Sequence, residues 1–435
     1  MKKIAIAFAV LTFSLIVYPL PQARATTPGI YFDHIVIIAF ENQNLNAIFG
    51  SPNAPFINSM LSGGSYTTAY SVDQTGCSAA CYLQMTSGSN QGKSDGYCPR
   101  ANSPCLTVSN LFSLFDSFNG LTYQAYCEFD STQSPTTCPR GADHFPFIAY
   151  SNANPGSNGG CFLAGNCANI FGGTASSCSG HSCTSADFVS AANAVTPPNF
   201  LWYTPSDCNN MHGQTSNCAN GCASSDSTCF VQQGDSYLQN FLIGTGTLSN
   251  PATGSLFASN AFSTGMRTLF VLWFDENSNP PELFYGTQVH QGFVSSMTYT
   301  HYGVLRTIEQ NWGLGYLANS ASSINISELF SGSPTVLLTP NPWSCTIIHN
   351  CSLPFTVESQ FGFSGTVTFT FQNLPTGDSV TFTPTSVTIG IGAKASTSMV
   401  VSGPCSGRVP PYPTVVATPN AGSQQSSQGR FICVQ

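Results

Sequence analysis

Two short polar pairs follow apolar runs in this chain, and their side chains are of the types that bind divalent cations. Glu41-Asn42 follows the run Ile35–Phe40, and Asp275-Glu276 follows Thr268–Phe274. Carboxylate and amide oxygens are hard ligands, so the two pairs together could hold a divalent metal ion. Taken singly, each pair could also be ordinary turn residues at the end of a strand.

The fold class decides whether these pairs can meet. Between residues 26 and 332, apolar strand-like runs alternate with helical patterns such as Ala54–Gly63 and His301–Trp312. This alternation predicts a layered α/β fold with a largely parallel sheet. Because ligands gather at the carboxyl ends of strands in such sheets, both pairs are expected at the functional edge.

The composition changes near residue 333. Beyond it lie short alternating strands rich in Thr and Val, such as Gly365–Phe371 and Ser379–Pro384. We expect residues 333–435 to form a small all-β sandwich. These strands carry no clustered histidines or carboxylates, so the sandwich is interpreted as an accessory domain.

Residues 1–25 have the pattern of a secretory signal peptide. Lys2 and Lys3 precede an apolar run from Ile4 to about Val17, and Ala23-Arg24-Ala25 forms the cleavage site. We therefore expect a protein that is secreted or otherwise extracytoplasmic, the cell surface included, without a transmembrane anchor. The chain has 11 basic and 19 acidic residues, and this negative balance argues against nucleic acid as a partner.

The chain contains 18 cysteines, which in an exported protein indicate disulfides. Those between Cys77 and Cys229, and those between Cys345 and Cys433, are even in number, so each region can close its bridges internally. A zinc cluster is the alternative, although no pair of CxxC motifs occurs. The segment 156–183 is interpreted as a long disulfide-stapled surface insertion. Spacing alone leaves the connectivity open.

A series of short motifs in fixed order resembles the bacterial and fungal phosphoesterase family, which includes acid phosphatases and phospholipases C of the alkaline phosphatase superfamily. The series covers roughly residues 31 to 318. Its members are Phe32–Asn42, Phe49-Gly50, Ser87-Gly88, Pro198–Phe200, Thr204-Pro205, Cys208–His212, Gly234-Asp235, Phe274–Glu276 and Thr300–Leu314.

The resemblance implies an alkaline-phosphatase-like layered sheet core with a metal centre and an active-site hydroxyl. Glu41, Asn42, Asp275 and Glu276 fall where the family places metal ligands, and Ser78 falls where its nucleophile lies. A serine hydroxyl is a poor nucleophile at neutral pH, so a metal would have to stabilise its ionised form. A divalent metal ion, whose identity is open, is therefore the expected cofactor.

The resemblance also implies histidines close to the phosphate. His212 and His301 are expected to assist the leaving group, and His144 is expected to bind phosphate together with Asn209 and Asn210. Each histidine could instead be structural. Two acidic residues are secondary candidates. Asp235 could be a helix N-cap as readily as a metal ligand, and Asp207 could belong to a turn.

The chain departs from the family around the nucleophile. The family usually reads His-Pro-Ser-x-Pro-Asn-Tyr, whereas this chain reads Gly76-Cys-Ser-Ala-Ala-Cys-Tyr82. We expect Cys77 and Cys81 to tie this segment to other parts of the chain, and Thr75 is the alternative hydroxyl. The family often has acidic residues where Asn210 and Gly213 stand, so one ion is expected more readily than two.

These patterns predict a secreted metal-dependent phosphoesterase that uses a serine nucleophile, of acid phosphatase or phospholipase C type. Lipid substrates would require an apolar rim, which Phe145, Phe147, Trp202 and Tyr203 could supply unless they belong to the core. The alternative is a catalytically silent extracellular protein that uses the same fold to bind an anion or a glycan. The oligomeric state is left open.

Overall fold

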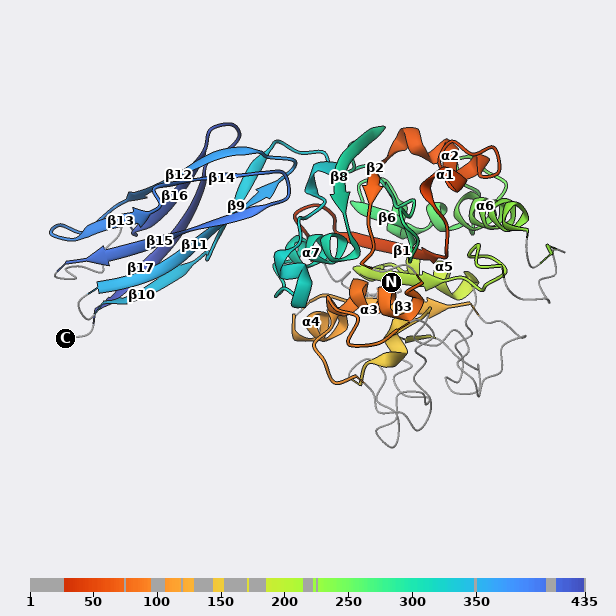
Figure 1. Cartoon of the computed structure of the whole chain (residues 1–435), viewed down its shortest axis with the longest axis horizontal. Coiled ribbons are helices and arrows are strands. Elements are labelled where there is room, and N and C mark those ends of the chain that lie inside the picture. The colour runs from red at the N-terminus through yellow and green to blue at the C-terminus, as the bar shows by residue number, and fades with distance from the viewer. Residues whose placement is uncertain are drawn as a thin grey trace, which may run out of the picture.

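The computed structural model describes residues 27–73, 76–94, 106–118, 120–128, 144–151, 170–171, 185–213, 222–223, 226–347, 350–403 and 412–433. The predicted signal peptide, Thr75 and most of the segment 156–183 lie outside these residues. Within the described part, an α/β body and an all-β body lie side by side (Figure 1). The predicted layered α/β core with a C-terminal β-sandwich is confirmed.

The α/β body is built on a sheet of the order β4-β3-β5-β1-β6-β7-β2-β8. Its strands are β1 His34–Phe40, β2 Gly64–Tyr70, β3 Tyr123–Cys127, β4 Ile170–Phe171, β5 Phe200–Thr204, β6 Thr268–Phe274, β7 Leu283–Tyr285 and β8 Phe293–Tyr299. Neighbouring strands from β4 to β6 are parallel. Strand β8 is parallel to β2, and only the short strand β7 is antiparallel to its neighbours β6 and β2. The described sheet is therefore mixed but largely parallel, as the sequence predicted.

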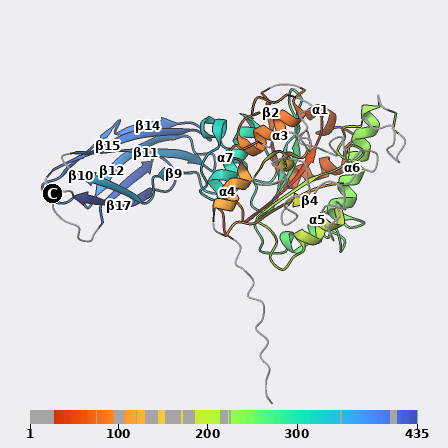
Figure 2. The ribbon, with the colours of Figure 1, turned by 90° about the horizontal axis from the view of Figure 1, so that it is seen from below.

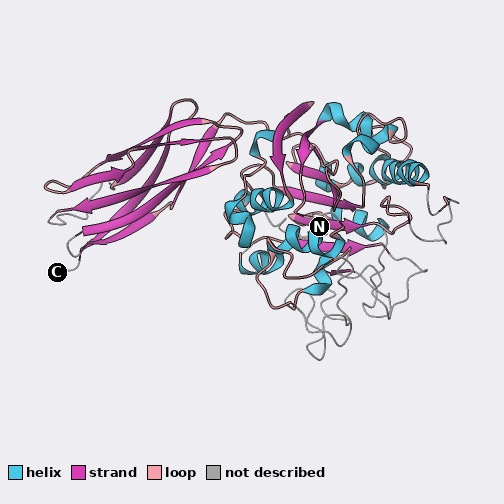
Figure 3. Cartoon of the chain, viewed as in Figure 1, coloured by secondary structure: helices cyan, strands magenta, loops and turns pink. Residues whose placement is uncertain are grey.

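Helices cover both faces of this sheet (Figures 2 and 3). The helices are α1 Leu45–Ile48, α2 Pro55–Met60, α3 Ser78–Ser87, α4 Leu111–Ser117, α5 Ser185–Ala192, α6 Ser227–Ile243 and α7 His301–Asn311. Strand β1 is buried throughout, and its side chains alternate between the two faces. Ile35 and Ile37 join the core under α3, α4 and α7, whereas Val36 and Ile38 join the core under α2, α5 and α6.

The C-terminal body consists of two sheets, β10-β17-β16-β12-β14 and β13-β15-β11-β9. The strands are β9 Thr335–Thr339, β10 Trp343–Ile347, β11 Asn350–Gln360, β12 Gly365–Gln372, β13 Ser379–Thr383, β14 Ser386–Ile389, β15 Lys394–Ser402, β16 Thr414–Pro419 and β17 Gln425–Cys433. The alternating Thr and Val pattern places one face of each strand inward. Val367, Phe369 and Val401 lie among the buried residues of their shared core.

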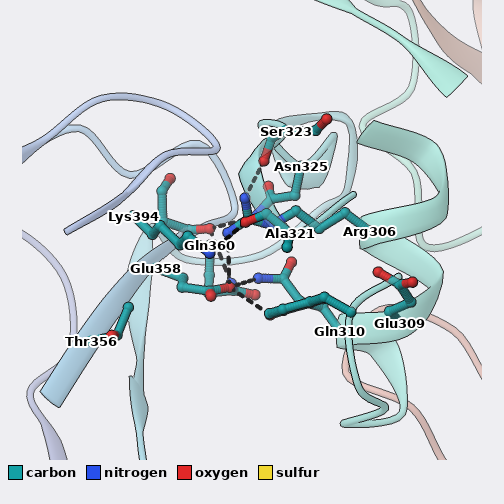
Figure 4. A network of polar contacts seen from close by, with 12 residues as sticks. Arg306, Glu309, Gln310, Ala321, Ser323, Asn325, Thr356, Glu358, Gln360 and Lys394 are labelled. Carbon is teal, nitrogen blue, oxygen red and sulfur yellow. Dashed lines mark hydrogen bonds and ion pairs between the residues drawn. The ribbon is translucent and has the colours of Figure 1, made fainter. Parts of the chain in front are cut away.

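Buried polar contacts join the two bodies along α7 (Figure 4). The Arg306 guanidinium of α7 lies 3.3 Å from the Glu358 carboxylate of β11, and both side chains are almost fully buried. Gln310 of the same helix also donates to Glu358, as does the Tyr316 hydroxyl. The sandwich is therefore attached through desolvated charge as well as apolar packing.

No described helix combines the length and the apolar character that a membrane span requires.

Candidate metal centre and active site

The carboxyl ends of β3, β5, β1 and β6 lie next to one another, and the candidate side chains follow them. Phe40 of β1 is the register partner of Phe274 in β6, so Glu41 and Asp275 emerge side by side. The Asp275 amide donates to the Phe40 carbonyl at 3.2 Å, and the Asn42 amide donates to Asp275 Oδ1 at 3.1 Å. The structure thus brings together the first three residues of the two polar pairs.

Two buried oxygens at this point have no hydrogen-bond partner among the described residues. They are Asn42 Oδ1 and Asp275 Oδ2. Asn42 has φ +49°, a left-handed conformation that asparagine tolerates better than most residues and that is common at functional sites. Buried oxygens without a donor are costly unless a cation compensates them. Glu41, Asn42 and Asp275 therefore fit a hard divalent ion.

The electrostatics of Asp275 agree with that fit. Burial first, and then the neighbouring charge of Glu276, raise the pKa of Asp275 to about 7, although hydrogen bonds with Glu41 and the Asn42 amide act in the opposite direction. Glu282 lies fully buried nearby, and its Oε1 accepts from the Phe274 amide at 3.2 Å. Burial and the charge of Asp275 likewise raise the pKa of Glu282. A bound cation would offset this concentration of buried carboxyl groups.

Glu276 is directed differently from the other three predicted ligands. Its Oε2 accepts from the backbone amides of Cys77 and Ser78, with the second bond at 3.0 Å. These amides stand at the N-terminus of α3, where a carboxylate also interacts favourably with the helix dipole. In this structure Glu276 therefore anchors α3 to the end of β6.

That anchor places Ser78 at the first position of α3, where the serine is 5% exposed. Tyr82 lies four residues later and hence on the same face of the helix. The Tyr82 hydroxyl donates to Glu41 Oε1. Ser78 therefore begins the helical face that contacts the candidate metal centre.

The expectation that Cys77 and Cys81 connect this segment to other parts of the chain is wrong. The two cysteines form a disulfide with each other across the first turn of α3. Residues four apart on a helix lie close enough for this bond. The bridge staples the turn that carries Ser78. Among the described residues, Cys222 with Cys229 and Cys345 with Cys351 also form disulfides that are local in sequence.

His144 and His212 lie on the other side of Glu41. Ligand atoms of Glu41, His144 and His212 all lie within 4.8 Å of one another. His144 Nε2 is 3.3 Å from Glu41 Oε2, and its Nδ1 is 3.7 Å from Asp207 Oδ1. The two imidazole rings meet edge to face with centroids 5.2 Å apart. The structure thus contains a group of side chains of the types that bind metal ions.

His301 is held by the protein on both sides of its ring. Its Nδ1 accepts from Trp273 Nε1 at 3.0 Å and lies 2.9 Å from the Tyr70 hydroxyl. Its Nε2 is 2.7 Å from the Asp275 carbonyl, to which it donates. Burial lowers the pKa of His301 to about 4, so the ring is neutral over the physiological range. This arrangement suits a residue that fixes the Asp275 backbone.

The loop after β5 uses its asparagines to hold its own shape. Asn209 Nδ2 donates to Glu128 Oε2 at 2.9 Å, and Asn210 Oδ1 accepts from the His212 amide at 2.9 Å. Gly213 has φ +75°, and a Cβ there would lie within 2.3 Å of the Phe230 ring. A side chain at this position would therefore require the Phe230 ring to move and the backbone to hold a strained conformation.

Asp235 lies within α6 and caps the N-terminus of another helix, α2, so in this structure it acts as a cap and not as a metal ligand. From within α6, its carboxylate accepts from the amides of Phe56 and Ile57 at the start of α2, at 3.0 and 2.8 Å.

The aromatic side chains considered for a lipid-binding rim, Phe145, Phe147, Trp202 and Tyr203, are all buried in the core.

Two residues of the site, Tyr82 and Glu282, were not predicted from the sequence. Tyr82 ends the divergent segment Gly76–Tyr82, and its spacing from Ser78 was the available clue. Glu282 follows two prolines in a loop, a context that gives no indication that burial places it beside Asp275.

Comparisons with known proteins give one curated relative. Phosphatidylinositol-3-phosphatase from Mycobacterium tuberculosis (strain ATCC 25618 / H37Rv) is 27% identical over 299 residues, which cover 66% of this chain and 81% of that protein. No protein-family model matches the chain.

Two solved structures are similar over much of the chain. One is a protein from a study of glycosaminoglycan metabolism by Bacteroides thetaiotaomicron, with a TM-score of 0.42 and 11% identity, covering 77% of this chain and 86% of that one. The other is a phosphonate monoester hydrolase from Silicibacter pomeroyi, with a TM-score of 0.37 and 10% identity, covering 91% and 88%.

Proposed function

We propose that this chain is a metal-dependent phosphoric ester hydrolase that acts on phosphate monoesters outside the cytoplasm. The observation that carries the proposal is the meeting of Glu41, Asn42 and Asp275 at adjacent strand ends, next to the helix that begins at Ser78. The similarity to a phosphatidylinositol phosphatase supports the same reaction class.

In this proposal Glu41, Asn42 and Asp275 hold one hard divalent ion through oxygen ligands. When bound, the ion would stabilise the ionised serine hydroxyl and polarise the phosphoryl group. Glu276, the fourth predicted ligand, serves instead to hold α3 against β6 through the Cys77 and Ser78 amides.

Ser78 is the proposed nucleophile. Its Oγ attacks phosphorus in line, the bond from phosphorus to the leaving oxygen breaks, and a phosphoserine forms with release of an alcohol. Water then attacks the phosphoserine, which regenerates the hydroxyl and releases inorganic phosphate. The Cys77–Cys81 disulfide and the Glu276 anchor would hold Ser78 in a fixed position during both steps.

The half-buried His212 is the proposed proton donor to the leaving oxygen, and His144 lies beside it. His301 was an equal candidate in the sequence, but both of its ring nitrogens have protein partners. We assign it to positioning Asp275. Asn209 and Asn210 are likewise assigned to shaping the loop that carries His212.

A phosphomonoester substrate is preferred over a phospholipid cleaved by a phospholipase C reaction. The relative is named as a phosphatase, a class that removes a terminal phosphate. The four aromatic residues that could have formed a lipid-binding rim are buried.

The test compares hydrolysis of an aryl phosphate with that of phosphatidylcholine, by the metal-loaded wild type and two serine variants. Ser78→Ala is expected to abolish release of phosphate. Ser87→Ala is the matched control, because it removes a buried hydroxyl at the far end of α3 that donates to the Leu83 carbonyl. Full activity of Ser78→Ala would contradict the assignment of Ser78 as the nucleophile. A wild type that is inactive with every divalent ion would favour the silent binding protein.

A further inference from the structure

We propose a second binding site, on the C-terminal body, which takes an acidic carbohydrate through the carboxylate of a uronic acid unit. The site is a hollow of about 430 Å³ on the sheet that contains β10, β16 and β17, a volume in the range of small-molecule sites. It is lined by Pro342, Trp343, Ser344, Tyr412, Gln428, Gly429 and Arg430. All of these residues belong to the sandwich, so the site is separate from the candidate metal centre and does not rest on the proposed function.

Strand alternation brings three polar side chains of the hollow to the same outer face. Successive side chains of a strand point to opposite faces of the sheet. Gln428 and Arg430 of β17 are exposed, whereas Gly429 between them is buried. Ser344 of β10 is the register partner of Arg430 and is exposed as well. An amide, a hydroxyl and a guanidinium therefore lie together, and these groups can bond to the hydroxyls and carboxylate of a sugar.

Tyr412 adds an exposed aromatic ring to this face. The exposed large apolar side chains among the described residues are Ile30, Val195, Val294, Leu374 and Tyr412. Of these only Tyr412 is aromatic, and it is 54% exposed. One face of a pyranose ring carries carbon-bound hydrogens and is apolar, so it packs well on an aromatic ring. An exposed ring beside hydrogen-bonding groups therefore suits a carbohydrate better than a purely ionic ligand.

The backbone around the hollow is held in place by the sandwich itself. The Tyr412 carbonyl accepts from Asn373 Nδ2 at 3.0 Å, and the next carbonyl, of Pro413, accepts from the Gly429 amide at 3.0 Å. Gly429 lies against the Trp343 indole, where a Cβ would come within 2.0 Å of the ring. The backbone can therefore approach the buried indole closely. A site with its backbone fixed beforehand loses less conformational entropy when a ligand binds.

The charge of the hollow is opposite to that of the chain. The chain has a formal net charge of −8, but no carboxylate lines the hollow. Arg267 pairs with Asp33, and Arg306 pairs with Glu358. The Arg430 guanidinium has no hydrogen-bond or ion-pair partner among the residues that the structure describes. Its planar fork matches the planar carboxylate of a uronic acid in two parallel hydrogen bonds, whereas a neutral sugar would leave this charge without a partner.

The experiment titrates the full chain calorimetrically with three probes of the same length: an oligogalacturonate, a neutral malto-oligosaccharide and an oligoglutamate. The test variants are Tyr412→Ala and Arg430→Gln. Leu374→Ala is the control for the first, because it removes another exposed apolar side chain of the sandwich. Lys394→Gln is the control for the second, because it removes the same charge from an exposed position on β15. Thermal melting checks that each variant is folded, and hydrolysis of an aryl phosphate is measured in parallel.

We expect the wild type to bind the oligogalacturonate more tightly than either other probe, and less tightly as salt is added. Arg430→Gln should weaken this binding at least about 10-fold, since a charge-assisted bond is lost. Tyr412→Ala should weaken it about 10-fold through loss of the ring, whereas Tyr412→Phe should bind like the wild type. Leu374→Ala and Lys394→Gln should keep the wild-type affinity. Every variant should hydrolyse the aryl phosphate at the wild-type rate, because none lies at the candidate metal centre.

A wild type that does not bind the oligogalacturonate would overturn the inference, as would unchanged binding in Arg430→Gln or Tyr412→Ala. Equal affinity for the malto-oligosaccharide would show that the carboxylate is not recognised. Equal affinity for the oligoglutamate would show that charge alone is recognised, without the sugar. If binding depends on Tyr412 and Arg430 but no phosphate ester is hydrolysed, the carbohydrate site stands and the proposed function fails.

Discussion

Tyr82 donates a hydrogen bond from its hydroxyl to Glu41, and this contact joins α3 to the end of β1. Both side chains are fully buried. Because Glu41 Oε1 accepts from Tyr82, Glu41 Oε2 is turned toward His144 at 3.3 Å. The position of one carboxylate in the candidate metal centre is thus fixed from the helix that carries Ser78.

Replacing Tyr82 by Phe is expected to weaken metal binding roughly 10- to 100-fold, because an orienting partner of a metal ligand is lost. At saturating metal concentration kcat should largely recover, since Tyr82 does not need to touch the substrate. Calorimetric metal titration and kinetics at several metal concentrations measure both effects.

Tyr150→Phe is the matched control for that variant. Tyr150 is equally buried, and its hydroxyl lies 2.7 Å from Thr86 Oγ1 on the same helix. Each variant should lose about 1 kcal/mol of unfolding free energy. Only Tyr82→Phe should change metal affinity, and an equal change in both variants would contradict the positioning role.

Glu358→Gln should destabilise the whole protein by about 3–5 kcal/mol, because it leaves the Arg306 guanidinium buried without a counter-charge. Denaturant unfolding followed by fluorescence measures the loss. Asp33→Asn is the comparison, since it breaks the Arg267–Asp33 pair, whose arginine is 41% exposed. That change should cost no more than about 1 kcal/mol. Equal losses would show that the contact along α7 is not desolvated in solution.

Glu309 is expected to make stability depend on pH. Burial raises its folded-state pKa from 4.5 to about 8, against hydrogen bonds from Ser320 and the Leu317 amide. The folded state therefore binds the proton more tightly, and the associated stability is complete below pH 4.5 and is lost as the pH rises through about 8. Glu309→Gln should flatten this part of the profile when unfolding free energies are compared at pH 5 and pH 8. An unchanged slope would contradict the burial of an ionisable group.

Asp235→Ala should destabilise the protein by about 1–3 kcal/mol, because it leaves the buried Phe56 and Ile57 amides without an acceptor. Metal content should stay the same. Asp226→Ala, which removes the N-cap contact to the Cys229 amide of α6 on an exposed surface, should cost about 1 kcal/mol. Loss of bound metal in Asp235→Ala would restore Asp235 as a ligand.

The sequence predicted the fold class because local patterns report burial. Fully apolar runs such as Ile35–Phe40 indicate strands covered on both faces, and Thr-rich alternation indicates strands covered on one. The same patterns placed Glu41 and Asp275 at strand ends. They did not predict β7. This strand has three residues and directly follows Pro281-Glu282, so its apolar pattern is too short to indicate a strand.

The sequence by itself determined that polar pairs end two apolar strands and that Ser78 lies in a cysteine-flanked segment. Only the tertiary structure decided that β1 and β6 are neighbours, which brings together Asn42 and Asp275 from positions 233 residues apart. It also turned Glu276 toward α3, enclosed His301, and placed His144 and His212 beside Glu41. The physical reason is that periodicity records only whether a side chain is buried, whereas its partner depends on strand order and on the loops that return the chain to the same edge of the sheet.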